Sequence, residues 1–164
     1  MALLRPAARL GGIFKQCGRL IATTQANRSY ADMAFTFASP SEVFYRDASV
    51  KQVDVPSLSG DFGILPEHVP LLAVLRPGVV KVYEEDGSTN NVFVSSGSVT
   101  INSDSSVQIL AEEATPLDRV DGQAIREGLT KAQQELTSAS SEVAKAEAQV
   151  AIDCYEALQK ATGH

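Results

Sequence analysis

The fold is decided by one stretch, Val79-Val-Lys-Val-Tyr-Glu-Glu-Asp-Gly-Ser-Thr-Asn-Asn-Val-Phe-Val94. Apolar residues alternate with other residues on both sides of Asp86-Gly87, as they do in strands that have one buried face. The Asp-Gly dipeptide suits the positive φ values of a tight primed turn. Residues 79–84 and 89–94 are therefore predicted to form a β-hairpin.

The same alternation recurs on both sides of this hairpin, and turn signals such as Ser59-Gly60, Ser96-Gly97 and Asn102-Ser103-Asp104 separate the segments. Short strands at such spacing predict a compact β-sandwich or barrel over residues 31–116. The alternating pairs are Val53/Val55, Val80/Val82, Val92/Val94, Val99/Ile101 and Val107/Ile109.

The pattern changes to a helical one after Pro116, because residues 118–163 contain no proline and are rich in alanine, glutamate, lysine and glutamine. Residues 137–141 interrupt this part with serines and a threonine, and Ser140 or Ser141 is suited to cap a second helix. Residues 117–164 are therefore predicted to form an antiparallel two-helix hairpin. The apolar positions at helical spacing are Ile125, Leu129, Ala132 and Leu136, followed by Val143, Val150, Cys154 and Leu158.

Two helices of this kind have no third partner within the chain, and alanine-rich helices bury little apolar area at a shared seam. Either the hairpin simply packs on the sandwich, or its free side awaits another protein and can detach. The sequence leaves both alternatives open.

The first 30 residues resemble a targeting segment rather than a part of the fold. They hold five of the 14 basic residues and no acid. All 20 acidic residues and the other nine basic residues therefore lie from Asp32 onward, which gives that part a net charge of about −11. Charged residues interrupt every apolar run, which excludes a secretory signal, and a mitochondrial transit peptide cleaved at Tyr30-Ala31 is expected. A disordered basic tail is the alternative. No run of about 18 apolar residues exists, so no membrane span is predicted.

Residues that could carry catalysis are scarce. After the predicted cleavage site the chain has only His68, His164 and Cys154 as histidine or cysteine, without zinc spacing. A Cys–His pair is less expected than a small buried cysteine. The acidic residues in Glu84-Glu85-Asp86 and Glu112-Glu113 are adjacent in sequence. Because adjacent residues of a strand point to opposite faces, neither group presents two carboxylates to one substrate. We expect no catalytic residue, cofactor or metal, and the acidic charge argues against nucleic acid as a partner.

A distinctive segment is Gly60-Asp-Phe-Gly-Ile-Leu-Pro-Glu-His-Val-Pro-Leu-Leu72. Its two prolines stiffen the backbone and exclude a central strand. It is too apolar for a loop that only connects two strands. Some of its residues are therefore expected in the core, and the rest in a rigid exposed ridge that binds a partner. His68 is assigned equally to a structural hydrogen bond or to that interface.

This segment, together with Leu75-Arg-Pro-Gly78 and Phe93-Val-Ser-Ser-Gly-Ser98, resembles the signature of the F-type ATP synthase ε/δ family. Phe35-Thr-Phe-Ala-Ser-Pro40 and Ser105-Ser-Val-Gln-Ile-Leu-Ala-Glu-Glu-Ala114 resemble its mitochondrial δ branch in particular. The likeness covers residues 33–164 in order. It implies a flattened β-sandwich followed by a helical hairpin, in agreement with the patterns above.

The resemblance also implies a role without catalysis, as a central-stalk (rotor) subunit on the matrix side of the mitochondrial inner membrane, one copy per complex. Such a subunit carries torque between the γ subunit and the c-ring, and its hairpin contacts the small mitochondrial ε subunit. By position in the motif, the γ side would be Leu65, Pro66, His68, Val69, Pro70 and Leu71. The c-ring side would be Ser57, Ser59, Gly60 and Asp61.

Two other functions fit the sequence less well. Bacterial relatives that sense ATP carry Ile/Leu-Asp-X-X-Arg-Ala at the first helix, whereas Leu117-Asp-Arg-Val-Asp-Gly122 lacks the Arg-Ala, so we expect no ATP binding and no inhibitory extension. A lipoyl or biotinyl carrier domain would need a lysine at a hairpin tip, and the best tip here is Asp86-Gly87-Ser88.

Overall fold

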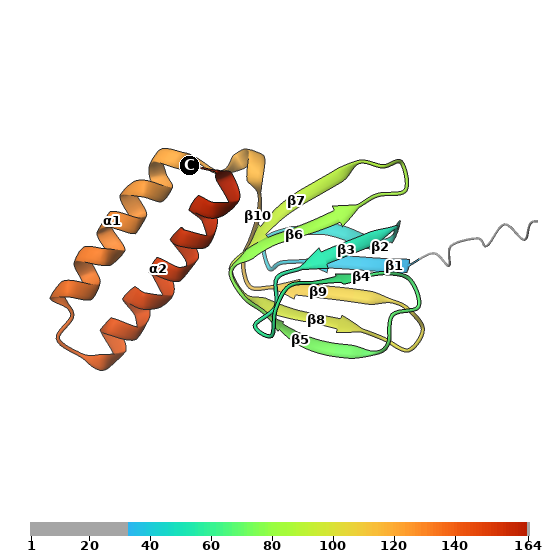
Figure 1. Ribbon diagram of the computed structural model, residues 1–164, viewed down its shortest axis with the longest axis horizontal. Coiled ribbons are helices and arrows are strands. Elements are labelled where there is room, and N and C mark those ends of the chain that lie inside the picture. The colour runs from blue at the N-terminus through green and yellow to red at the C-terminus, as the bar shows by residue number, and fades with distance from the viewer. Residues whose placement is uncertain (1–32, 164) are drawn as a thin grey trace, which may run out of the picture.

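A β-sandwich with a helical hairpin at one end is the architecture of the computed structural model, which describes residues 33–163 (Figure 1). This confirms the predicted fold class. The predicted processing site Tyr30-Ala31 and His164 lie outside the described residues. No helix within residues 33–163 is long and apolar enough to cross a membrane.

Each layer of the sandwich is a five-stranded sheet. Neighbouring strands run antiparallel, except that β1 and β9 are parallel although about 70 residues of chain separate them. Sheet 1 has the order β2(Val43–Val50), β1(Met33–Ala38), β9(Val107–Ala111), β8(Gly97–Ile101), β5(Leu71–Leu75). Sheet 2 has the order β10(Ala114–Pro116), β7(Thr89–Val94), β6(Gly78–Tyr83), β3(Gln52–Val55), β4(Phe62–Ile64).

Alternate residues of the strands fill the space between the sheets. In β1 the side chains of Met33, Phe35 and Phe37 are fully buried, whereas the residues between them are half-buried. Each fully buried side chain of this size stabilises the fold by roughly 1.5–3 kcal/mol. The predicted alternation is confirmed, because all ten residues of the pairs Val53/Val55, Val80/Val82, Val92/Val94, Val99/Ile101 and Val107/Ile109 are buried.

Strands β6 and β7 form the predicted hairpin, but the prediction of a primed turn is wrong. A primed turn of the Asp-Gly type needs positive φ at both residues, and only Gly87 has one, at 88°. The N–H of Gly87 donates to the backbone carbonyl oxygen of Glu84 at 3.1 Å, and the N–H of Glu84 donates to the backbone carbonyl oxygen of Ser88 at 3.0 Å. This wider loop directs the Glu84 carboxylate toward β2, where Tyr45 holds it.

Tyr45 connects the two sheets at this end of the sandwich. Its hydroxyl donates to Oε1 of Glu84 at 2.8 Å and accepts from Nδ2 of Asn90 at 3.0 Å, while its ring lies 5.3 Å from the ring of Phe35. Burial and, next, the bond to the Glu84 carboxylate raise the pKa of Tyr45 from 10.0 to about 12. The contact therefore depends on a protonated phenol.

Tyr45→Phe is expected to lower the free energy of unfolding by about 1 kcal/mol at neutral pH, because one hydrogen bond is lost. The unfolded phenol ionises near pH 10 and the folded one near 12, so the stabilisation is complete below pH 10 and disappears as the pH rises to 12. Urea unfolding at pH 8, 10 and 11 should show the wild type converging on Tyr45→Phe. Glu84→Gln, which removes the charge but keeps an acceptor, should reduce this slope only in part. Parallel pH profiles for all three proteins would contradict the assignment.

The helical part begins with a short 3₁₀ turn, η1(Leu117–Arg119), and continues as α1(Gly122–Ser138) and α2(Glu142–Thr162). Asp121 caps α1 by accepting from the N–H of Gln123 at 2.8 Å. Ser141 caps α2 by accepting from the N–H of Ala144 at 3.1 Å, as one of the two predicted caps. Both caps satisfy amide donors that lack partners inside the helix.

The seam between the helices is formed by Ile125 and Ala132 of α1 against Ala148 and Ile152 of α2, all buried. At Gly128 the helices approach so closely that an added Cβ would lie 2.4 Å from Cζ of Tyr155. The predicted apolar face of α1 is confirmed.

The apolar positions predicted on α2 do not belong to the seam between the helices, because Val143 and Val150 are exposed. They do share a helical stripe with Cys154 and Leu158, but this stripe points toward the sandwich rather than toward α1. Only the C-terminal end of the stripe reaches the sandwich. There Cys154 and Leu158 line a cavity of about 290 Å³ together with Phe93, Ser95, Glu113, Ala114, Thr115 and Val120.

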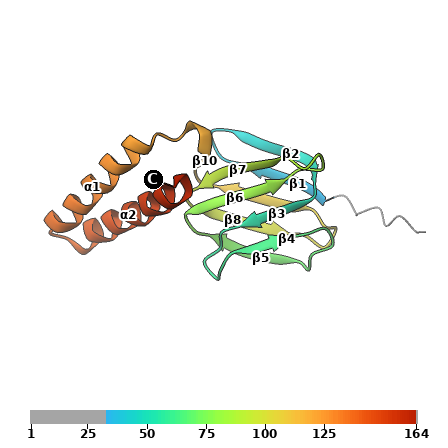
Figure 2. The same ribbon diagram turned by 45° about the horizontal axis from the view of Figure 1, so that its top comes forward.

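The hairpin therefore touches the sandwich mainly through the C-terminal half of α2, beside β6, and the rest projects away from it (Figures 1 and 2). One half of the α2 stripe is packed on the sandwich, as the first alternative drawn from the sequence required, and the other half is uncovered; a partner for it, or detachment of the hairpin, stays a prediction.

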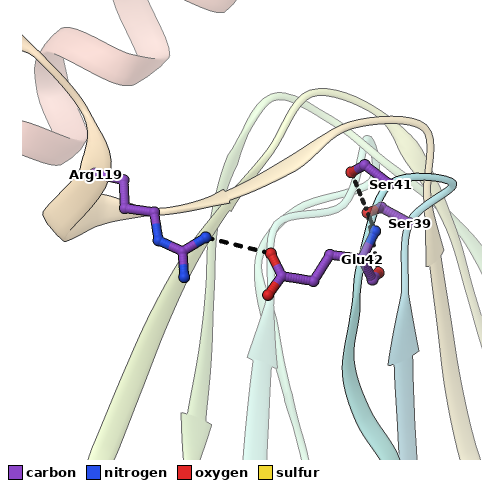
Figure 3. Close-up of polar contacts among 4 residues, drawn as sticks. All are labelled: Ser39, Ser41, Glu42 and Arg119. Carbon is purple, nitrogen blue, oxygen red and sulfur yellow. Dashed lines mark hydrogen bonds and ion pairs between the residues drawn. The ribbon is translucent and has the colours of Figure 1, made fainter.

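An ion pair ties the linker to sheet 1 (Figure 3). Nη1 of Arg119 in η1 lies 3.4 Å from Oε2 of Glu42, which ends the turn between β1 and β2. Ser39 shapes this turn, because its Oγ accepts from the N–H of Glu42 at 3.2 Å and contacts Oγ of Ser41 at 3.0 Å. Both charged groups are largely exposed, so the pair contributes at most about 1 kcal/mol.

Candidate functional site: an uncharged sheet face flanked by two loops

The predicted ridge, residues 65–71, connects β4 of sheet 2 with β5 of sheet 1. Pro66 and Glu67 occupy the centre of a tight turn, in which the N–H of His68 donates to the oxygen of Leu65 at 3.2 Å. Glu67 has a φ of 62°, a left-handed conformation that a glutamate adopts at a cost of roughly 1–2 kcal/mol. The turn is therefore held in one strained shape, which leaves Leu65 and Val69 exposed.

His68 is fixed inside the ridge rather than presented by a mobile loop. Its Nδ1 donates to the oxygen of Val69 at 2.8 Å, and its ring lies 6.4 Å from the ring of Phe62. This is the structural hydrogen bond that the sequence left as one alternative. Because His68 is only half-buried, the outer edge of the ring still lies on the surface of the ridge.

The outer face of sheet 1 continues from the ridge and contains a row of aligned residues. Cross-strand partners share a face, so Val74 of β5, Ser98 of β8, Leu110 of β9, Ala38 of β1 and Val43 of β2 form one line across all five strands. Val74 and Leu110 are 56% and 57% exposed. At a strand spacing of about 4.8 Å, the line is roughly 19 Å long.

A second row runs beside the first, from Leu72 of β5 through Thr100 and Gln108 to Thr36 of β1. Leu72 is 71% exposed. The outward residues of β1, β9, β8 and β5 are called the uncharged face, because none of them is ionisable. They are Ala34, Thr36, Ala38, Gln108, Leu110, Ser98, Thr100, Leu72 and Val74.

This absence of charge contrasts with the rest of the protein, which carries about −11 from Asp32 onward. Charges are depleted at the centre of protein interfaces, and large exposed apolar patches on a soluble protein mark interaction sites. The uncharged face with the 65–71 ridge therefore has the properties of a docking surface for a protein.

The second predicted segment, residues 57–61, lies at the other end of β5. The N–H of Leu58 donates to the oxygen of Val74 at 3.1 Å, and the N–H of Arg76 donates to the oxygen of Pro56 at 3.1 Å. The loop thus covers part of the free edge of β5. Nη2 of Arg76 lies 2.8 Å from Oδ1 of Asp61 and fixes the end of the loop.

The side chains of the 57–61 loop differ in what they offer to a partner. Ser57 is 1% exposed, and its Oγ lies 2.8 Å from Oγ of Ser59, so the Ser57 side chain cannot itself contact the c-ring as the sequence suggested. The exposed surface of the loop comes instead from Leu58, Ser59, Gly60 and Asp61.

The structure thus brings the two predicted segments to opposite ends of one strand. It adds residues that were not assigned to the site from the sequence, of which Leu72, Val74, Leu110, Val43 and Leu58 are exposed. The sequence did not reveal the open face of β5, because Leu71-Leu-Ala-Val-Leu75 is apolar at every position and such a pattern indicates a strand buried on both faces.

Groups for catalysis do not converge in the described part of the chain. No cluster of three or more His, Cys, Asp or Glu that could hold a metal ion occurs within residues 33–163. His68 lies in the ridge, whereas Cys154 belongs to α2 and lines the cavity between that helix and strands β7 and β10. Burial, with a smaller contribution from the charge of Glu113, raises the pKa of the Cys154 thiol. A raised pKa lowers the thiolate fraction, which opposes a role as nucleophile.

Fold and surface together define a protein-binding module, a β-sandwich with one uncharged face and a partly uncovered helical hairpin. The family model described as ATP synthase, Delta/Epsilon chain, beta-sandwich domain matches residues 32–117. A second, described as Metazoan delta subunit of F1F0-ATP synthase, C-terminal domain, matches residues 121–161. The chain belongs to the delta/epsilon family of ATP synthase chains, as the sequence resemblance indicated.

Curated relatives agree along nearly the whole chain. The ATP synthase subunit delta, mitochondrial, of Caenorhabditis elegans is 43% identical over 97% of this chain and 96% of its own. The protein of the same name from Eremothecium gossypii is 41% identical over 86% of this chain and 91% of its own. A chain of the Euglena gracilis mitochondrial ATP synthase OSCP/F1/c-ring structure has the same fold, with a TM-score of 0.73 at 24% identity over 80% of this chain and 81% of its own.

Proposed function

We propose that this chain is a non-catalytic central-stalk subunit of the mitochondrial ATP synthase, which links the γ subunit to the c-ring and carries torque between them. The observation that carries the proposal is the uncharged face of sheet 1 on an otherwise acidic protein. Its relatives are named mitochondrial delta subunits, and a chain of similar fold belongs to a Tetrahymena thermophila central stalk/c-ring structure. This subunit would lie on the matrix side of the inner membrane.

The γ subunit is assigned to the uncharged face and the 65–71 ridge. Apolar area gains roughly 25 cal/mol per Å² when it is removed from water, and here it lies on a sheet that cannot bend easily. The strained turn at Glu67 and the two prolines fix the ridge before binding, so that little conformational entropy is lost on docking. A part that transmits torque needs this stiffness and not a reactive group.

The c-ring is assigned to the 57–61 loop, at the opposite end of β5 from the ridge. The small ε subunit is assigned to the hairpin, where Val143 and Val150 continue the stripe that packs on the sandwich but have nothing over them. Three separate surfaces would then serve three partners, with one copy of this chain in each complex.

The proposal is tested by tagging the C-terminus, solubilising mitochondria in mild detergent and resolving the complexes on a native gel. We expect co-migration with γ, the c-ring and the catalytic head, and a mature chain that starts near Ala31. Migration as a free small protein, beside a complete synthase assembled without it, would overturn the function and leave the fold as described.

A further inference from the structure

A hollow of about 460 Å³ lies where the C-terminal end of α2 meets sheet 2. Figure 2 shows this end of α2 beside the start of β6. The hollow is lined by residues from four parts of the chain: the loops around Pro56 and Arg76, strands β6 and β7, Leu117 of η1, and the last turns of α2. An occupant would therefore touch the sandwich and the hairpin together.

The lining is basic on a protein that is acidic. Arg76, Lys81 and Lys160 line the hollow, against Asp61 as its single acidic residue. These are three of the nine basic residues from Asp32 onward, whereas 19 of the 20 acids lie elsewhere. Such local focusing of positive charge attracts an anion even when the net charge of the protein is negative.

The two lysines are not engaged elsewhere in ion pairs. Among residues 33–163, four ion pairs occur, and neither Lys81 nor Lys160 takes part in any of them. Asp54 lies opposite Lys81 on β3, but its carboxylate accepts from Nε2 of Gln52 at 2.6 Å and from the hydroxyl of Tyr83 at 3.0 Å. The ammonium groups thus remain available to a ligand.

The chemistry of the remaining lining selects the ligand class. Asn91 lies beside Lys81 across the β6–β7 pair and adds an amide that can donate to an oxygen. Within residues 33–163 no aromatic ring lines the hollow, so none of these residues would stack on a nucleotide base there. Arginine, lysine and amide donors without an aromatic platform suit a phosphate group.

We propose that this hollow binds a phosphate group, and that the bound phosphate fastens the C-terminal end of α2 to the sandwich. Lys160 is the contact on the hairpin and Lys81 the contact on the sandwich, while Arg76, whose Nη2 is paired with Asp61, can add its remaining N–H donors. Since the anion would neutralise cations from both parts, its binding and the docking of the hairpin stabilise each other. The hollow shares Asp61 with the 57–61 loop assigned to the c-ring, but none of its lining residues belongs to the uncharged face or the 65–71 ridge assigned to γ.

The test uses the full chain and inorganic pyrophosphate, titrated calorimetrically at low ionic strength to limit screening. Lys81→Gln and Lys160→Gln should each weaken binding about tenfold, because each removes a charge-assisted contact. Lys145→Gln is the matched control, since Lys145 lies on the same helix but outside the hollow and should change the affinity less than about twofold. Pyrophosphate should also raise the melting temperature of the wild type and of Lys145→Gln more than that of the other two variants.

Two further ligands, ATP and vesicles of anionic phospholipid, distinguish the source of the phosphate. ATP binding no more tightly than pyrophosphate would identify the phosphates, and not the base, as what is recognised. Vesicles of anionic phospholipid that bind the wild type more tightly than either lysine variant, where pyrophosphate does not bind, would identify a lipid headgroup. Equal affinity of all four proteins for every one of these ligands, or no saturable binding of any ligand by the wild type, would overturn the proposal.

Discussion

Gly97→Ala is expected to lower the free energy of unfolding by about 3–5 kcal/mol, the largest effect on stability of any substitution considered. Gly97 begins β8 and pairs with Ala111 of β9 on one side and Leu75 of β5 on the other. Its φ of 154° costs a residue with a Cβ roughly 1–2 kcal/mol. An added Cβ would also lie 2.2 Å from the oxygen of Leu110 and 2.8 Å from Cα of Ala111, where backbone must shift.

The matched control is Gly60→Ala, because Gly60 also has a positive φ, at 126°, but nothing lies within 4 Å of the added Cβ. It should cost about 1–2 kcal/mol from the backbone alone. The difference between the two variants in urea unfolding isolates the steric term, which overpacking of a well-filled site typically sets at about 1–3 kcal/mol. Equal losses in the two variants would show that β8 and β9 separate without cost at this point.

Gly97 illustrates what a single sequence conveys about this fold. Ser96-Gly97 is readable as a turn signal, but the contact that makes the glycine necessary comes from β9, and strand order is not encoded in local alternation. The same applies to the parallel pairing of β1 with β9. Periodicity predicted buried faces correctly at Val53/Val55 and Val107/Ile109 because alternation reports one strand at a time.

The site shows the same division between local and long-range information. The stiff ridge around His68 was predictable, since prolines and apolar residues act locally. Leu72 and Val74 were not, because a strand that is apolar throughout reads as buried on both faces, and only the sheet order makes β5 an edge strand with an open outer side. Likewise, helical spacing gave the stripe of Val150 and Cys154 but not the neighbour that the stripe would meet.

Joint substitution of Val74→Asp and Leu110→Asp is expected to reduce binding to the γ subunit at least about a hundredfold, since removing two anchors and desolvating two carboxylates costs several kcal/mol. The residues lie in one row of the uncharged face, separated by Ser98. Both are more than half exposed, so the free chain should lose only about 1 kcal/mol of stability, mainly through lower β-propensity.

Two controls make this result specific to the face. Val74→Thr with Leu110→Thr introduces no charge and matches Thr36 and Thr100, which already lie on the face. This pair loses apolar area but buries no carboxylate, so its loss of affinity should be clearly smaller than that of the aspartate pair. Val143→Asp with Val150→Asp adds the same two charges to α2, at exposed fractions of 69% and 66%, and should leave binding to γ unchanged.

Co-purification of the full chain with γ, alongside urea unfolding of each variant alone, separates docking from folding. The expected result is loss of γ in the sheet pair with an unfolding free energy within about 1 kcal/mol of the wild type, because the substituted side chains face outward from a sheet whose inner face carries the core. If the α2 pair loses γ and the sheet pair retains it, the docking surface is the hairpin. The uncharged face would then be expected to bind a different partner, because Leu72, Val74 and Leu110 still expose apolar side chains on it.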